Sequence, residues 1–341
     1  MRVKSELLKL SIKICNLDKS LFYWYNGNVL EGVICVYVDD FLWTGTAEFK
    51  NCVIEKLYSL FCIGNLAHNS FKYVGMHITA AKEGILVDQL QYVSSVNPIK
   101  ISFQRASCKA SELSTSEKQE YRALLGQLSW IATHTRPDIA FETCDLSVSH
   151  SRATVGDLLR LNKLVSRMKS DQLRMAFPKL KSVESCVLEA YADASFANLP
   201  DGSSQGGFVI FLKDQDNKRC PIFWQSRKIR RVVKSTLSAE TLALLDCAEA
   251  SVYLARILLE ITGYNLKVNC VIDNKSLFDA LHSSHCLEDR RLRIDIAVLR
   301  DMIDRGEITI VSWVASPLQL ADCLTKKGVC TKRLPAAISR D

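Results

Sequence analysis

The chain has 341 residues, of which 48% are hydrophobic and 24% are charged. Its length suggests two domains, and its composition is ordinary for a soluble globular protein with a large core. The formal net charge of +7 favours polyanionic partners mildly and lies well below a histone-like excess, so a generic basic surface is an equal alternative.

The positions of the cysteines and the lengths of the apolar runs indicate the cellular compartment of the protein. None of the thirteen cysteines forms a Cys-x-x-Cys pair, and most lie in apolar runs, as expected for reduced thiols in an intracellular protein. No apolar run approaches the roughly 20 residues of a membrane span. The first residues also lack a signal-peptide pattern. We therefore expect a soluble intracellular protein with no membrane partner.

Near the N-terminus, two apolar runs flank an acidic pair. The segment 33–45 reads Val-Ile-Cys-Val-Tyr-Val-Asp-Asp-Phe-Leu-Trp-Thr-Gly and places Asp39 and Asp40 where a tight hairpin turn falls. Adjacent aspartates are also common at ordinary turns, because Asp tolerates unusual backbone angles. The segment therefore predicts a β-hairpin whose carboxylates serve either chemistry or the turn.

The middle of the chain is helical in pattern. Residues 102–118 are polar and serine-rich, which predicts a long surface loop. Apolar residues then recur at helical spacing and predict helices over 117–136, 139–150 and 155–168. Pro178 and mixed charges over 170–185 predict a linker before the next domain.

From Cys186 onward the pattern predicts a mixed five-stranded α/β sheet with helices. The first expected strand ends at Asp193, the second and third cover 206–212 and 220–226, the fourth ends at Asp273, and the fifth covers 308–314. The expected helices cover 235–262, 276–281 and 292–305, and a short last helix carries Asp322.

Four acidic residues of this segment stand where they can converge: Asp193, Glu240, Asp273 and Asp322. Two of them end strands and two lie on helices. Carboxylates without imidazole or thiolate suit Mg²⁺, which prefers oxygen ligands. Two such ions, with Mn²⁺ as a substitute, promote phosphodiester hydrolysis. For each acid the alternative is a helix cap or a solvated strand end.

Two sets of motifs resemble copia-type retrotransposon Pol proteins. Tyr37-Val-Asp39-Asp40, Phe71-Lys-Tyr-Val-Gly75 and Thr135-Arg-Pro-Asp-Ile139 resemble the reverse transcriptase palm and thumb. Tyr191-Ala-Asp193-Ala-Ser195, Ser238-Ala-Glu240, Ile272-Asp273-Asn274 and Ala321-Asp322-Cys-Leu-Thr-Lys326 resemble the four ribonuclease H motifs. The loop 314–319 has no histidine, unlike that of many ribonucleases H.

The resemblance implies an α/β (α+β multidomain) chain with a partial reverse transcriptase followed by a ribonuclease H-like domain. The expected divisions are a partial palm (1–100), a helical thumb or connection (101–170), a linker (171–185), a ribonuclease H-like domain (186–330) and a tail (331–341). The fingers and a further catalytic aspartate lie upstream of the hairpin in the family. We therefore expect Asp39 and Asp40 to be an insufficient polymerase remnant.

The implied function is hydrolysis of the RNA strand of RNA–DNA hybrids. We assign Asp193 as a ligand bridging two Mg²⁺ ions, Glu240 and Asp273 to the leaving-group ion, and Asp322 to the nucleophile ion. The alternatives are an RNA-directed DNA polymerase, if a longer product supplies the missing parts, and an inactive nucleic-acid-binding remnant.

The expected partner is a hybrid or another nucleic acid, recognised through its shape and its 2′-hydroxyl groups. The expected phosphate contacts are the basic residues before the Glu240 helix, with a solvated basic loop as the alternative: Lys228, Arg230, Arg231 and Lys234. Ser195, Ser238 and Asn274 adjoin the acids and are expected at the RNA strand. An exposed palm edge predicts self-association, and the family implies a cytoplasmic, particle-associated or nuclear location.

Overall fold

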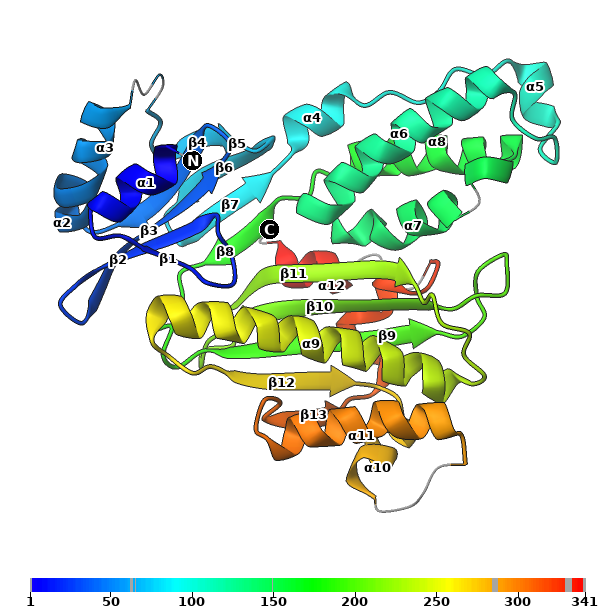
Figure 1. Cartoon of the computed structure of the whole chain (residues 1–341). Coiled ribbons are helices and arrows are strands. Elements are labelled where there is room, and N and C mark those ends of the chain that lie inside the picture. The colour runs from blue at the N-terminus through cyan, green and yellow to red at the C-terminus, as the bar shows by residue number, and fades with distance from the viewer. Residues whose placement is uncertain are drawn as a thin grey trace.

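The computed structural model describes residues 2–61, 64, 66–148, 150–283, 288–328 and 333–339. Figure 1 shows N-terminal strands and short helices in blue, a group of helices in cyan to green, and a layered C-terminal fold in green to red. The mixed α/β class expected from the sequence is confirmed. Of the predicted tail, residues 331, 332, 340 and 341 lie outside the described residues.

The first sheet is antiparallel and contains the predicted acidic hairpin. Its strands, in spatial order, are β1 (Lys13–Ile14), β2 (Leu21–Asn26), β3 (Val29–Tyr37) and β4 (Asp40–Gly45). Its helices are α1 (Arg2–Lys9), α2 (Ala47–Phe49), the π-helical η1 (Lys50–Ile54) and α3 (Glu55–Leu60). Phe49 is fully buried, and a Cβ added at Gly32 would lie 2.2 Å from its ring. The close approach of helix and sheet therefore requires glycine at position 32.

A second antiparallel sheet corrects the predicted linker. Its strands, in spatial order, are β5 (Ser70–Tyr73), β6 (Met76–Ala81), β7 (Gly84–Asp88) and β8 (Met175–Pro178). β8 lies inside the segment 171–185 and pairs with β7, from Val87 opposite Met175 to Gly84 opposite Pro178. The chain therefore returns to this sheet after the helices. The segment is a structural strand, and Pro178 stands at its end on the sheet edge, where its missing N–H is tolerated.

The central helices pack around one apolar core. They are α4 (Leu90–Ser95), α5 (Phe103–Ser107), α6 (Thr115–His134), η2 (Pro137–Ile139), α7 (Ala140–Val148), η3 (His150–Arg152) and α8 (Val155–Ser170). The three predicted helices are present. The predicted loop 102–118 is wrong in part, because it contains α5 and the first turn of α6. Capping boxes at Ser114–Glu117 and Thr154–Asp157 fix the starts of α6 and α8.

The buried residue Arg136 forms hydrogen bonds at the C-terminal end of α8. Its side chain is 2% exposed and forms two hydrogen bonds of 2.8 Å with the Asp138 carboxylate. Its other terminal nitrogen donates to the carbonyl oxygens of Met168 and Asp171, at 3.0 and 2.8 Å. These are carbonyls that a helix end leaves without partners, so Arg136 is a structural residue.

Replacing Arg136 by Met should destabilise the protein by about 3–5 kcal/mol, because Asp138 would keep a buried charge without its partner. The midpoint of urea denaturation, followed by circular dichroism, measures this change. Arg122→Met is the matched control, because Arg122 is exposed on α6. Equal midpoints for the two variants would contradict the structural role.

The C-terminal sheet has five strands in the order β11-β10-β9-β12-β13. The strands are β9 (Val187–Ser195), β10 (Gln205–Lys213), β11 (Arg219–Lys228), β12 (Lys267–Ile272) and β13 (Ile310–Trp313). β9, β10 and β11 pair antiparallel, whereas β12 runs parallel to both β9 and β13. This order is that of the ribonuclease H fold that the sequence predicted.

The two faces of this sheet carry different helices. The core on one face contains side chains from the three longer helices, α9 (Thr236–Thr262), α10 (Lys275–His282) and α11 (Arg290–Asp304). The core on the other face contains side chains from η5 (Leu320–Leu324) and α12 (Arg333–Ile338), and the short η4 (Ser316–Leu318) precedes η5. The predicted tail is therefore wrong where α12 lies, since Leu334 and Ile338 are buried against the sheet.

Both earlier parts of the chain contact the C-terminal fold. Trp224 of β11 donates its ring N–H to the carbonyl oxygen of Ala132 in α6, at 2.8 Å. At the other end, the Glu260 carboxylate of α9 accepts hydrogen bonds from the backbone and side chain of Asn16, at 2.8 and 2.9 Å. The Tyr25 hydroxyl donates to the carbonyl oxygen of Ile261, at 2.9 Å. Hydrogen bonds therefore connect the first sheet and the helices to the C-terminal fold.

Candidate metal centre

Asp193 lies at the centre of the C-terminal sheet and has no exposed surface. It belongs to β9, between neighbours on both sides. Its carboxylate accepts a hydrogen bond from the Thr325 hydroxyl and one from Lys326 Nζ, the latter at 3.1 Å. Burial raises the pKa of Asp193 to about 6, although the charge of Lys326 acts in the opposite direction.

Asp273 and Asp322 lie beside Asp193. Asp273 directly follows β12, and because β12 runs parallel to β9, their carboxyl ends meet at one edge of the sheet. Asp322 is 6% exposed on η5. One carboxylate oxygen from each of the three aspartates lies within 4.8 Å of the other two. The predicted short helix that carries Asp322 is a 3₁₀ helix.

Glu240 approaches Asp193 from α9. Its side chain accepts a hydrogen bond from the backbone N–H of Ala194, at 3.1 Å, and the residue is 5% exposed. Burial, followed by the charges of Asp193 and Asp273, raises the pKa of Glu240 to about 9. The structure therefore brings the three predicted aspartates together and places Glu240 beside them, where ionised carboxylates require a compensating positive charge.

Thr325 and Lys326 are further residues of this site, for which the sequence pattern predicts no role of their own. Lys326 Nζ lies 2.5 Å from Asp322 Oδ1 and also contacts Asp193, while Thr325 Oγ1 donates to Asp193. This one ammonium pairs with two of the carboxylates, so the charge of the ionised aspartates is balanced only in part. The signal for Lys326 was its position four residues after Asp322, the spacing at which side chains meet on a helical turn.

Gln319 occupies the loop that lacks a histidine. It is 1% exposed, donates from Nε2 to the carbonyl oxygen of Ala192 at 2.9 Å, and accepts from the backbone N–H of Ala321 at 3.1 Å. Gln319 therefore joins η5 to β9 and fixes the position of Asp322 relative to Asp193.

The basic loop before α9 has mostly paired charges. Lys228 pairs with Asp201, Arg231 with Asp295 at 2.9 Å, and Lys234 with Asp289 at 3.9 Å. Arg230 is exposed and forms no ion pair within the part of the chain that the structure describes. Of the four predicted phosphate contacts, Arg230 is the cation most available to a ligand.

The three polar residues predicted near the RNA strand make different contacts within the protein. Asn274 caps α10, because its side chain accepts from the backbone N–H of Leu277 at 2.9 Å. Ser238 contacts the hydroxyl of Ser235, which caps α9. Ser195 lines a pocket next to the acidic cluster.

The hairpin acids Asp39 and Asp40 are exposed at the turn between β3 and β4. Val38 in this turn has a positive φ of 54°. Among the described residues, the only cluster of three or more potential metal ligands is the one at Asp193, so no third ligand accompanies the hairpin pair. The geometry matches ordinary turn chemistry at these two positions.

Comparison with curated proteins identifies the relatives of this chain. It is 25% identical over 328 residues to the retrovirus-related Pol polyprotein from transposon RE1 of Arabidopsis thaliana, and 26% identical over 328 residues to that from transposon RE2. Each alignment covers 91% of this chain. The chain is similar to the retrovirus-related Pol polyproteins of copia-type retrotransposons. It spans about a fifth of these relatives' length, 21% and 22%.

A yeast transposon protein is similar to a shorter part of the chain. The chain is 27% identical over 218 residues to the putative transposon Ty5-1 protein of Saccharomyces cerevisiae, and the alignment covers 59% of this chain and 67% of that protein. No family model matches the chain.

Among the described residues, no helix is both long and apolar enough to cross a bilayer.

Two solved structures align with parts of this chain. Ribonuclease H1 from Halobacterium salinarum aligns with 40% of this chain and 93% of its own, at 19% identity and a TM-score of 0.30. The foamy viral protease–reverse transcriptase in complex with an RNA/DNA hybrid aligns with 84% of this chain and 36% of its own, at 15% identity and a TM-score of 0.48.

Proposed function

We propose that this chain hydrolyses the RNA strand of RNA–DNA hybrids at a site that holds two Mg²⁺ ions. The observation that carries the proposal is the convergence of Asp193, Asp273 and Asp322 within 4.8 Å, with Glu240 beside them on α9. A structural role would disperse these acids or pair each with its own cation. Their concentration around one ammonium is costly unless further cations bind.

The donor set fits Mg²⁺. All four side chains offer carboxylate oxygens, the ligands that Mg²⁺ prefers, and no His or Cys belongs to the cluster. When bound, such a pair of ions supplies an activated water and stabilises the departing 3′ oxygen. Asp193 is the candidate bridging ligand because it lies at the centre, and Glu240 and Asp273 would hold one ion while Asp322 would hold the other.

The protein's own contribution is to fix the carboxylates before substrate arrives. β9 and β12 position Asp193 and Asp273, the Ala194 N–H holds Glu240, and Gln319 anchors the turn of Asp322. A fixed cluster avoids the reorganisation that a flexible set of ligands requires on binding. Burial of Asp193 also excludes bulk water from one side of the site.

Recognition of the hybrid would rest on its shape. A hybrid presents 2′-hydroxyl groups in a wide minor groove, which distinguish RNA from DNA without reading sequence. Ser195, Ser238 and Asn274 stand near the acids and are the candidate contacts to the RNA strand. The basic loop of Lys228, Arg230, Arg231 and Lys234 is the candidate contact to backbone phosphates.

Replacing Arg230 by Ala should weaken hybrid binding by about three- to tenfold, and the decrease of log affinity with log salt should become shallower by about 1. Arg230 has this effect because it forms no intramolecular ion pair among the described residues. Fluorescence anisotropy in Ca²⁺ measures both quantities. Arg305→Ala, at the end of α11, is a matched control because Arg305 is an exposed arginine that pairs with Asp301. Unchanged affinity in Arg230→Ala would remove this loop from the interface.

The experiment that tests the proposed function compares four substrates. Purified protein is incubated in Mg²⁺ with a labelled RNA–DNA hybrid, double-stranded RNA, double-stranded DNA and single-stranded RNA. We expect internal cleavage of the RNA strand of the hybrid alone. Cleavage of single-stranded RNA at an equal rate would indicate a different nuclease. No cleavage of any substrate by folded protein, in Mg²⁺ or Mn²⁺, would reject the proposal.

A further inference from the structure

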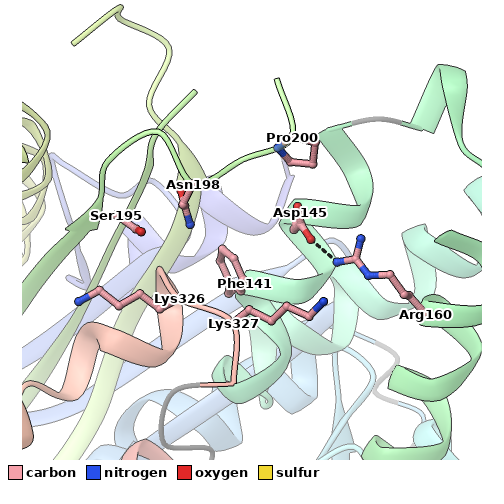
Figure 2. Close-up of a pocket in the computed structure, with 8 residues that line it drawn as sticks. All are labelled: Phe141, Asp145, Arg160, Ser195, Asn198, Pro200, Lys326 and Lys327. Carbon is pink, nitrogen blue, oxygen red and sulfur yellow. Dashed lines mark hydrogen bonds and ion pairs between the residues drawn. The ribbon is translucent and has the colours of Figure 1, made fainter. Parts of the chain in front are cut away.

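A pocket of about 340 Å³ lies where the central helices meet the C-terminal fold. Phe141 of α7 and Arg160 of α8 line it from the helical side, while Ser195 at the end of β9 and Asn198 in the segment that joins β9 to β10 line it from the other side. Lys326 and Lys327, which follow η5, complete the lining (Figure 2). The pocket therefore requires both parts of the chain.

The lining of the pocket is cationic. Lys327 is exposed and forms no ion pair among the residues that the structure describes, and Figure 2 shows it extended towards the pair formed by Asp145 and Arg160. Arg160 is fixed by Asp145, which is 8% exposed, and lies 3.4 Å from Asp157. Lys326 is paired with Asp193 and Asp322, so Lys327 is the cation of this lining that has no ion pair among the described residues, and it is the group most available to an anion.

The pocket adjoins the acidic cluster. Lys326 lines the pocket and also binds Asp193 and Asp322, and Ser195 follows Asp193 by two residues on β9. The Asn198 side chain donates to the carbonyl oxygen of Thr325 at 2.9 Å, which holds the β9–β10 segment against the turn after η5. A ligand in the pocket would therefore extend directly towards the carboxylates.

A strand of nucleic acid meets both conditions. Its backbone is a repeated anion, so one phosphodiester can occupy the pocket while a neighbouring one lies at the acidic cluster. A volume of about 340 Å³ exceeds that needed by a single phosphate and leaves space for an attached sugar. A small anion would occupy the pocket alone, whereas a strand can also be held at the acidic cluster through divalent ions bound there, because the carboxylates themselves repel a phosphate.

We propose that this pocket binds a backbone phosphate and sugar of the nucleic-acid strand next to the bond that is cut. The central helices then form part of the substrate site through Arg160. The identity of that strand as the RNA of a hybrid rests on the proposed function. The binding of a backbone phosphate does not, and it can be measured without cleavage.

The test measures binding of a fluorescein-labelled hybrid in Ca²⁺ at several salt concentrations. Lys327→Ala removes the free cation, and Asp145→Asn with Arg160→Gln removes the paired cation without leaving a buried carboxylate alone. Lys163→Ala is the matched control, because Lys163 is an exposed lysine on α8 outside the pocket. Thermal unfolding establishes that each variant folds.

We expect each pocket variant to bind about tenfold more weakly than the wild type, with a salt dependence shallower by about 1, whereas Lys163→Ala stays within twofold. Equal losses in Lys163→Ala and Lys327→Ala would overturn the proposal in favour of a diffuse basic surface. Unchanged binding in Lys327→Ala would overturn it outright. A wild-type chain that does not bind the hybrid would overturn it too.

The failure of the proposed function is distinguishable from the failure of this proposal. If the wild type binds but does not cleave, and the pocket variants lose affinity for the hybrid, the phosphate-binding role of the pocket is supported and the ribonuclease activity is rejected. If the wild type cleaves and the pocket variants have an unchanged KM, the ribonuclease activity is supported and the phosphate-binding role of the pocket is rejected.

Discussion

Replacing Asp193 by Asn is expected to lower the rate of hybrid cleavage by at least about a thousandfold, because an amide replaces the carboxylate at the centre of the metal site. The shape of the side chain is preserved, so substrate affinity should change little. Single-turnover cleavage in saturating Mg²⁺ measures the rate, and anisotropy in Ca²⁺ measures the affinity.

The same variant should remain at least as stable as the wild type without metal. The pKa of Asp193 is raised by burial, so its ionised form is unfavourable in the folded state and its removal relieves repulsion with the neighbouring acids. Unfolding in EDTA checks this. A variant that cleaves at the wild-type rate would contradict the metal site, and one that unfolds readily would make Asp193 a structural residue.

Replacing Lys326 by Met should have the second largest effect, and the size of the loss of stability should depend on the metal. Lys326 is the only cation in direct contact with Asp193 and Asp322 among the described residues. Without it, two buried carboxylates lose their partner, which should cost about 2–4 kcal/mol in EDTA. In saturating Mg²⁺ the difference from the wild type should shrink, because bound ions provide the missing charge.

Thermal unfolding in EDTA and in Mg²⁺ gives both differences. The Mg²⁺ concentration for half-maximal stabilisation should also fall in Lys326→Met, since no ammonium competes with the ion. Lys327→Met is the control, because Lys327 is exposed next to Lys326 in the chain. A loss of stability equal in EDTA and Mg²⁺ would show that Lys326 is needed for the fold regardless of metal.

The acidic cluster could be predicted because its geometry follows from local patterns. Asp193 and Asp273 follow apolar runs that read as strands, and neighbouring parallel strands bring their ends together. Glu240 lies early in a long helical pattern that ends at Gly263, whose φ of 79° is typical of a helix C-cap. Each acid could therefore be placed on its element before the elements were assembled.

Features that depend on distant partners could not be predicted. β8 has four residues, contains a proline, and pairs with a strand about 90 positions earlier, so no local pattern distinguishes it from a linker. α5 and α12 are too short for helical periodicity to appear. The partners of Lys326 and the lining of the pocket arise only when the helices dock on the C-terminal fold.

The predicted self-association through the palm edge remains a prediction. β1 and β4 are the edges of the first sheet, and Cys15, directly after β1, donates its thiol to Glu260 of α9 at 3.3 Å. This docking leaves β4 as the edge that a second copy could use.

Anomalous diffraction from crystals of the wild-type protein soaked in Mn²⁺ tests the two-ion site most directly. We predict two peaks about 4 Å apart among Asp193, Glu240, Asp273 and Asp322, with Lys326 displaced from at least one aspartate. No peak at saturating Mn²⁺, with Lys326 still bound to Asp193 and Asp322, would contradict the account.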